Sequence, residues 1–278
     1  MFTHSNYHMA GGISKQNRRL LERLHQTTHG PFSATEAAEV LDLDHAKASA
    51  LLRYLARRGW LARVRRGLYV PVPLEAQKPG EWQEDPWIVA AEVFAPCYIG
   101  GWSAAEHWGL TDQLFRELIV VSARRVRERH VEIQGTPMRV KVVAEDRLFG
   151  TTPVWRRQVR VAVSDPSRTI VDVLDEPALG GGIRHVAEVV AEYFAGEQRA
   201  DDSLLAYAER LGNRTVFKRL GYLLESAGAE APELVDACLE RRSSGVTDLD
   251  PAVRRRGRIS TRWNLRINVS IGERVAPR

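Results

Sequence analysis

The chain has 278 residues, of which 44% are hydrophobic and 27% charged, a globular composition that excludes wholesale disorder. No apolar run reaches the roughly 18–20 residues of a membrane-spanning helix, and the length suggests two domains. Cys97 and Cys238 stand too far apart in the sequence to indicate a metal motif or a disulfide framework. The N-terminus lacks the basic and apolar segments of a signal peptide. We therefore expect a cytoplasmic protein with no membrane association.

The net charge of +5 is distributed unevenly along the chain. Residues 1–73 carry +6, residues 116–160 carry +6 and residues 251–278 carry +7. The intervening blocks, 74–115 and 161–250, carry −6 and −8. Basic blocks of this kind are candidate surfaces for polyanions such as DNA. Because 35 of the 40 basic residues are arginine, which a GC-rich genome also produces, the arginine bias alone indicates no function.

The N-terminal part predicts a flexible leader over residues 1–12 and then three helices. Ser33 and Glu36 have the spacing of a capping box at the start of the second helix, and Asp44 is the expected N-cap of the third. The apolar positions at helical spacing are Ile13, Leu20, Leu21 and Leu24 in the first helix and Ala48, Leu51, Leu52 and Leu55 in the third. Two short helices around a tight turn, after a supporting helix, are typical of a helix-turn-helix.

Two short strands follow the third helix, at 60–64 and 68–72, joined by Arg65-Arg66-Gly67. The glycine supplies the positive φ that such a turn requires. This hairpin predicts a wing, so residues 13–73 are expected to form a winged helix-turn-helix with Trp60 and Tyr69 as core anchors.

A winged helix of this kind places its third helix in the major groove and its wing on phosphates or in the minor groove. The residues that we expect at DNA are His45, Lys47, Ser49 and Arg53 on the helix and Arg63, Arg65 and Arg66 on the wing. The alternative is a winged helix used for protein contacts, with solvated surface charge. The concentration of positive charge in this block favours DNA.

Proline and glycine punctuate residues 74–86, which we expect to be a linker. Residues 87–278 predict a larger mixed α+β domain with a sheet-rich part at 98–163, a helical part at 166–242 and a basic tail at 251–278. Helices are expected at 86–93, 170–174, 183–194, 203–211, 216–226 and 232–241, and strands at 118–122, 131–134, 138–144 and 159–163. Residues 97–110 predict a short strand, a glycine turn and a helix, and residues 263–269 of the tail alternate like a strand. The whole chain is therefore expected to be an α+β protein.

Motifs of catalysis are missing from the sequence. It contains no Walker loop, no dinucleotide-binding glycine pattern, no zinc-protease motif and no nucleophile elbow. Gly180-Gly181-Gly182 precedes a helix, and we expect a loop and helix start there rather than an anion site. His107, His130 and His185 are scattered, and Lys141 has no acidic residue two positions before it, as a metal nuclease would need. We therefore expect no enzyme activity, no metal and no cofactor.

Two further basic segments remain open to two interpretations. Each is either a second nucleic-acid surface or a solvated charged loop. Their arginines are Arg124, Arg125, Arg127 and Arg129 in the first segment and Arg254, Arg255, Arg256 and Arg258 in the second. A helix is expected to start near Asp165, and we expect an ion pair between Arg168 and Asp172, four residues apart on it.

Several segments together resemble the AbiEi-type antitoxins of type IV toxin–antitoxin systems. Residues 66–71, Arg-Gly-Leu-Tyr-Val-Pro, resemble the end of the winged helix of that family. Residues 98–110 are similar to its serine-alanine, histidine-glycine-leucine segment, and residues 165–172 to its arginine-threonine, aspartate segment. Gly181-Gly182-Ile183 follows at the corresponding place. The resemblance covers residues 13–200.

This resemblance implies a bacterial antitoxin, encoded beside a nucleotidyltransferase-like toxin, that represses its own operon by binding double-stranded DNA repeats in the promoter. It also implies that the second domain, residues 87–278, is the antitoxin domain that counteracts the toxin. Whether it binds the toxin directly stays open. One alternative is a ligand-responsive winged-helix transcription regulator without a toxin partner, in which the aromatic segment 98–108 lines a pocket. A nucleic-acid-processing enzyme is the third possibility.

Overall fold

The computed structural model describes residues 13–73, 76 and 78–271. The predicted leader, part of the predicted linker and the last seven residues of the predicted tail lie outside the described residues. The chain divides into two compact units. The first ends at Val93 and also includes residues 132–137 and 155–161, and the second contains the rest. The domain boundaries expected from the sequence stay predictions.

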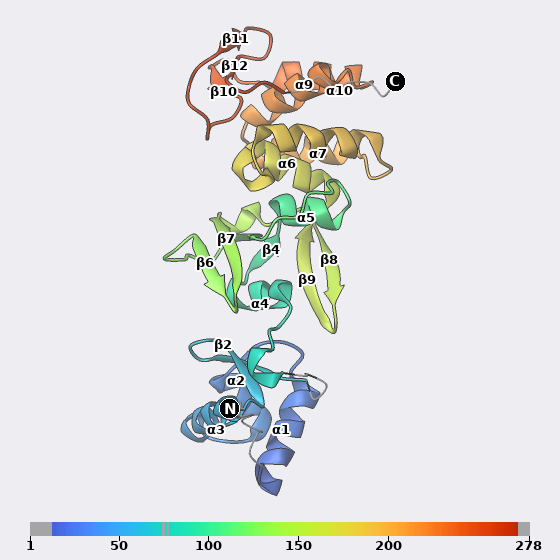
Figure 1. Ribbon diagram of the computed structural model, residues 1–278. Helices are drawn as coiled ribbons and strands as arrows, with labels where there is room; N and C mark the ends of the chain where they lie inside the picture. The colour runs from blue at the N-terminus through green and yellow to red at the C-terminus, as the bar shows by residue number, and fades with distance from the viewer. Residues whose placement is uncertain (1–12, 74–75, 77, 272–278) are drawn as a thin grey trace, which may run out of the picture. The chain divides into compact units, whose positions relative to one another are not determined.

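The N-terminal segment has the predicted winged helix-turn-helix arrangement (Figure 1). Its sheet has the strand order β1-β3-β2, with β2 and β3 antiparallel. Its elements are α1 (Lys15–Thr27), β1 (Phe32–Ser33), α2 (Ala34–Leu41), α3 (His45–Arg57), β2 (Leu61–Arg65) and β3 (Leu68–Pro71). The predicted third helix and both strands of the wing are therefore confirmed.

Local side-chain contacts set the starts of α2 and α3. The Ser33 hydroxyl accepts from the Glu36 backbone N–H at 3.2 Å, and the Glu36 carboxylate accepts from the Ser33 N–H at 2.7 Å. The Asp44 carboxylate accepts from the Lys47 N–H at 2.8 Å. Each contact satisfies a backbone donor that the first helical turn leaves unpaired. Gly67 has φ +80° at the turn of the wing, a value that disfavours any side chain there.

The core of this segment follows the predicted apolar stripes. Leu24, Leu52 and Leu55 are completely buried, and Tyr69 is buried with them. Leu51 and Trp60, both expected in the core, are only half-buried and pack at its margin.

A mixed six-stranded sheet has the order β6-β7-β5-β4-β9-β8. β4 pairs antiparallel with β5 and parallel with β9, and β5 pairs parallel with β7. The strands are β4 (Cys97–Ile99), β5 (Leu118–Ser122), β6 (His130–Ile133), β7 (Thr136–Val142), β8 (Thr151–Arg156) and β9 (Val159–Ser164). The predicted strands are confirmed, and β8 is an additional edge strand.

Helices form most of the rest of the second unit, and α6 lies at their centre. Every residue of α6 from Ser167 to Leu174 is buried, and its neighbours include α5, α7, α8 and α9. The α-helices beyond the winged helix are α4 (Pro86–Val93), α5 (Gly101–His107), α6 (Pro166–Asp175), α7 (Ile183–Ala195), α8 (Asp201–Leu211), α9 (Thr215–Ala227) and α10 (Pro232–Arg241). Short 3-10 turns are η1 (Pro79–Glu81), η2 (Glu145–Arg147) and η3 (Pro177–Gly180).

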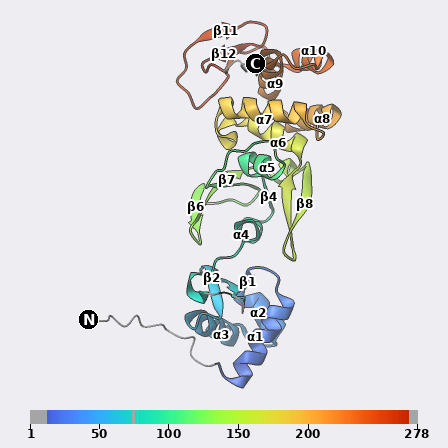
Figure 2. The ribbon, with the colours of Figure 1, turned by 45° about the vertical axis from the view of Figure 1, so that its right-hand side comes forward.

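A small C-terminal sheet lies beside α9, as Figures 1 and 2 both show. Its strands are β10 (Thr247–Asp248), β11 (Arg258–Ser260) and β12 (Leu265–Ile267), in the order β10-β12-β11. Trp263, only 1% exposed, packs directly on Gly221 of α9 and donates to the Glu225 carboxylate at 2.5 Å. The predicted strand in the tail is thus confirmed as β12. The α+β fold class predicted from the sequence is also confirmed.

Candidate functional site

The candidate DNA-binding residues of α3 lie on its exposed side. His45, Lys47 and Arg53 are exposed, and Ser49 is half-buried. The Arg53 guanidinium donates to the Ser49 hydroxyl one turn away at 3.2 Å. Lys47 forms an exposed ion pair with Asp44 at 2.9 Å, and this partner raises the pKa of the Lys47 ammonium. The start of α3 therefore presents polar and cationic groups.

The wing presents three exposed arginines. Arg63 lies on β2, and its Nε donates to the Arg65 carbonyl at 3.3 Å. Arg65 ends that strand, and Arg66 begins the turn before β3. Within β2, Arg63 and Arg65 are exposed and Val64 between them is buried, because alternate positions of a strand face opposite sides. Arg66 is exposed in the turn. The predicted wing residues thus lie in solvent on one hairpin.

The two further arginine segments are also exposed. Arg124, Arg125, Arg127 and Arg129 lie between β5 and β6, and Arg254, Arg255, Arg256 and Arg258 lie before or at the start of β11. Arg255 has an ion pair with Asp248 at 3.6 Å. The segments belong to separate elements, and their role at nucleic acid stays a prediction.

The glycines before α7 form a loop and helix start, as expected. Asp250 of the C-terminal segment reaches this helix, and its carboxylate accepts from the Ile183 N–H at 3.0 Å and from the Ala252 N–H at 2.9 Å. A carboxylate is the group that a helix N-terminus favours. The chain's own Asp250 therefore takes the position that an external anion would use.

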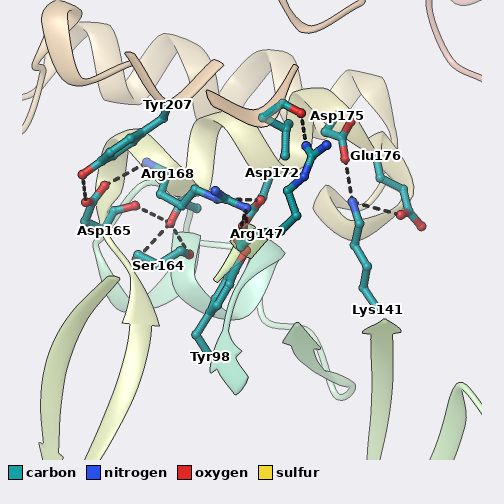
Figure 3. Close-up of polar contacts among 12 residues, drawn as sticks. Tyr98, Lys141, Arg147, Ser164, Asp165, Arg168, Asp172, Asp175, Glu176 and Tyr207 are labelled. Atoms are coloured by element: carbon teal, nitrogen blue, oxygen red, sulfur yellow. Dashed lines mark hydrogen bonds and ion pairs between the residues drawn. The ribbon is translucent and has the colours of Figure 1, made fainter. Parts of the chain in front are cut away.

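A buried polar cluster occupies the centre of the second unit (Figure 3). Arg168 Nε donates to the Asp172 carboxylate at 3.0 Å, which confirms the predicted pair. Tyr98 of β4 donates to the other Asp172 oxygen at 2.8 Å and accepts from Arg168 Nη2 at 3.0 Å. All three side chains are buried. We call this set, Tyr98, Arg168 and Asp172, the Arg168 cluster.

Asp165, the N-cap of α6, holds the Arg168 cluster at the start of the helix. Its carboxylate accepts from the Arg168 N–H at 2.8 Å and from the Tyr207 hydroxyl of α8 at 2.9 Å. The Arg168 guanidinium also lies 3.9 Å from the Phe149 ring centroid. Backbone, carboxylate and ring contacts therefore hold Arg168 in place.

A second polar group adjoins the Arg168 cluster. Lys141 of β7 lies 2.7 Å from the Asp175 carboxylate and 3.3 Å from that of Glu176 (Figure 3). Asn213 donates to the other Asp175 oxygen at 2.7 Å. No acidic residue stands two positions before Lys141 in the sequence, as a metal nuclease would need. The fold instead brings two carboxylates to it, Asp175 at the end of α6 and Glu176, which directly follows. Lys141 is their direct counter-ion.

Burial and charge move the pKa values of these groups in different directions. Burial raises the pKa of Asp172, against the opposing effect of Arg168 and Lys141. Burial also raises the pKa of Tyr98 well above its usual value, and the Asp172 charge adds to this. Burial alone would raise the pKa of Asp175, but the charge and hydrogen bond of Lys141 lower it. The cations Arg168 and Lys141 and the Tyr98 hydrogen bond thus all oppose the effect of burial on the pKa of Asp172.

A cleft of about 550 Å³ opens beside the Arg168 cluster. Its lining residues are Tyr98, Val121, Lys141, Val143, Ala144, Arg147, Arg168, Asp172, Asp175, Leu211, Gly212 and Asn213. From the aromatic segment 98–108, Tyr98 alone is among them, whereas Trp102 stacks on Phe115 at 4.5 Å and Trp108 donates to the Ser164 carbonyl at 2.7 Å. That segment is mainly a packed core. Within residues 13–73, 76 and 78–271, no three histidine, cysteine or acidic side chains gather as metal ligands.

None of the described helices is long and apolar enough to cross a membrane. The contacts of Tyr98, Lys141, Arg147 and Asn213 in this cleft were not predicted from the sequence. Their partners lie 34 to 74 residues away, so no local pattern signals them.

Comparison with known proteins supports the winged-helix assignment. Residues 19–72 match the family model described as "Transcriptional regulator, AbiEi antitoxin". No curated protein matches the chain. Among solved structures, the RV2827C protein from Mycobacterium tuberculosis has a similar fold, with a TM-score of 0.64 and 19% identity over 91% of this chain and 92% of that one. At this identity the likeness concerns the fold alone. The predicted resemblance to the AbiEi antitoxins is therefore confirmed over residues 19–72, the winged-helix part of the chain.

Proposed function

We propose that this protein is an antitoxin and DNA-binding autorepressor of a type IV toxin–antitoxin operon, and that it counteracts a nucleotidyltransferase-like toxin. The observation that carries the proposal is the winged helix itself, whose sequence matches a family of antitoxin transcriptional regulators. Its capped α3 and its arginine-bearing wing are the two elements with which such domains contact double-stranded DNA.

In this proposal the exposed start of α3 enters the major groove. His45, Lys47, Ser49 and Arg53 meet base edges and flanking phosphates there, and the hydrogen bond from Arg53 to Ser49 holds the arginine along the helix. Lys47 must exchange its Asp44 partner for a phosphate. That exchange costs little, because exposed ion pairs are weak.

The wing supplies the second contact. Arg63, Arg65 and Arg66 lie on phosphate or in the minor groove, where guanidinium groups are favoured in narrow A·T tracts. The arginines of segments 124–129 and 254–258 are proposed as an additional basic surface, used either for DNA or for the antitoxin task.

The DNA half is tested with a fragment of the protein's own promoter. We expect saturable binding to that fragment, and about 10³-fold or more weaker binding to a scrambled fragment of equal length. Equal binding to both fragments would mean that the protein does not recognise an operator.

The antitoxin half is tested separately by co-expression with the neighbouring gene. We expect the full chain to restore growth when that gene is toxic. The His45→Ala, Arg53→Ala variant should still restore growth if neutralisation is independent of DNA binding. Failure of the wild-type chain to rescue growth would contradict the antitoxin half and leave the DNA half intact.

The cleft beside the Arg168 cluster favours a second candidate function, a ligand-responsive transcription regulator without a toxin partner. A volume of about 550 Å³ lies within the usual range of small-molecule sites. A gene with no nucleotidyltransferase neighbour would favour this candidate.

A further inference from the structure

The cleft beside the Arg168 cluster contains one cation that no carboxylate of the described chain neutralises. Arg147 of η2 is half-buried, and its guanidinium meets only a carbonyl oxygen, that of Leu211. Each carboxylate that lines the cleft or pairs with Lys141 already has a cation other than Arg147 as partner. Asp172 pairs with Arg168, Asp175 with Lys141, and Glu176 with Lys141 and Arg139.

The charged residues that line the cleft are three cations, Lys141, Arg147 and Arg168, and two carboxylates, Asp172 and Asp175, so its lining is positive. An ion-pair network continues from Lys141 through Glu176 to Arg139. A half-buried cation without a counter-ion is unfavourable, since burial removes part of its hydration. An anion placed beside Arg147 would balance the charge.

Arg168 adds a second unsatisfied donor next to Arg147. Its side chain is 2% exposed, and its Nη1 has no hydrogen-bond partner among the described residues. Its Nη2 donates to the Arg147 carbonyl at 3.2 Å, so the two arginines are direct neighbours. Figure 3 shows the Arg147 guanidinium between Arg168 and Lys141 in that view. Guanidinium groups are the usual partners of carboxylate and phosphate oxygens, because their donors match two oxygens at once.

The remaining walls of the cleft set the kind of molecule that fits. Val121, Val143 and Leu211 contribute apolar surface, and Tyr98 adds the side of a ring. Asn213 and Gly212 lie at the same cleft, on the turn between α8 and α9. The molecule that suits this lining therefore has one anionic group and a small apolar part.

We propose that this cleft binds a small organic oxyanion, with its charged group at Arg147 and its apolar part against Val121, Val143 and Leu211. Carboxylates and phosphate monoesters share this chemistry. The assignment is independent of DNA binding by the winged helix, because it uses residues of the second unit alone.

Titration of the full chain with benzoate and, separately, with phenyl phosphate tests the assignment at constant ionic strength. The readout is the backbone amide signal of Gly212 and the side-chain amide signal of Asn213 in two-dimensional NMR spectra. We expect a saturable shift of both signals with at least one probe. The probe that binds more tightly shows whether the cleft prefers a carboxylate or a phosphate group.

Arg147→Gln is the decisive variant, and Arg139→Gln is its matched control. Arg139 lies in the same network, but it contacts Glu176 and the Ala178 carbonyl and does not line the cleft. We expect Arg147→Gln to lower the affinity for the probe about tenfold or more, as the loss of a charged hydrogen bond does. The affinity of Arg139→Gln for the probe should stay within about twofold of wild type. The affinity of Arg147→Lys, which keeps the charge, should lie between those of wild type and Arg147→Gln.

Three results would overturn the proposal. They are the absence of any saturable shift at Gly212, equal affinity in wild type and Arg147→Gln, and shifts confined to Gly257 in the exposed arginine segment. The last would mean that the probe binds only the surface arginines. Because the Arg147 guanidinium contacts a single carbonyl, its substitution should leave the fold intact. Unchanged amide signals elsewhere in the second unit check this.

Discussion

The hydroxyl of Tyr98 donates a 2.8 Å hydrogen bond to Asp172, a residue 74 positions further along the chain. This bond joins β4 to α6 and, with Arg168, closes the buried Arg168 cluster. Both partners are at most 3% exposed, so water competes little for this bond. The bond therefore contributes to the stability of the second unit as well as to the shape of the cleft.

Tyr98→Phe should lower the free energy of unfolding by about 1–3 kcal/mol, because it leaves a buried carboxylate oxygen without a donor. Urea denaturation measures this change. Tyr207→Phe is the control, since Tyr207 also donates to a carboxylate, that of Asp165, but is only half-buried. Tyr207→Phe should lower the free energy of unfolding by less than Tyr98→Phe does. Equal decreases in the two variants would contradict the role given to burial.

Asp175→Asn should destabilise the protein in a pH-dependent way. The Lys141 pair lowers the pKa of Asp175 below its ordinary value of 3.8, so its stabilisation is fully present above that value and is lost as the pH falls through the folded-state pKa. We expect a deficit of about 1–3 kcal/mol at pH 7. The deficit should shrink below pH 3.8. A deficit that does not change with pH would show that the carboxylate charge is irrelevant.

The thiol of Cys238 should resist modification in the native protein. Burial raises the pKa of this thiol to about 12, and the side chain is fully buried in the core of the second unit. At pH 8 the thiolate, the reactive form, is then present in only about one molecule in 10⁴. In a Cys97→Ser background, a thiol reagent should label Cys238 only after denaturant is added. Rapid labelling without denaturant would contradict this packing.

Gly221→Ala should destabilise the C-terminal sheet against α9. A methyl group there would lie 2.0 Å from the Trp263 ring. Overpacking of this kind costs about 1–3 kcal/mol, measurable as a lower urea midpoint. Gly245→Ala is the matched control, because no atom lies within 4 Å of its added carbon. We expect that variant to stay within about 0.5 kcal/mol of wild type.

Local patterns predicted the parts of the fold that local physics determines. The Ser33–Glu36 capping box, the Asp44 cap and the Arg168–Asp172 pair each join residues within one helical turn, so their spacing is visible in the sequence. β8 was not predicted, because Pro153 interrupts its pattern. A proline is tolerated there because β8 lies at the edge of the sheet.

The cleft could not be predicted in the same way. Tyr98, Lys141 and Arg147 meet α6 only after the sheet and helices have assembled. The sequence indicated Arg168 and Asp172 as a pair, but carried no signal of the partners brought by distant elements. The DNA-binding side chains of α3 and the wing stay predictions.

The salt dependence of promoter binding tests the central claim, that the wing arginines contact DNA phosphates. Wild type and the Arg65→Ala, Arg66→Ala variant are titrated against the promoter fragment at several salt concentrations. The control variant is Arg199→Ala, Arg241→Ala, whose arginines pair with Asp201 and Glu209 in the second unit. If both wing arginines contact phosphates, the slope of log K against log salt should fall in magnitude by about 2 in the wing variant and stay unchanged in the control. Specific binding with the wild-type affinity and slope in the wing variant would contradict the claim.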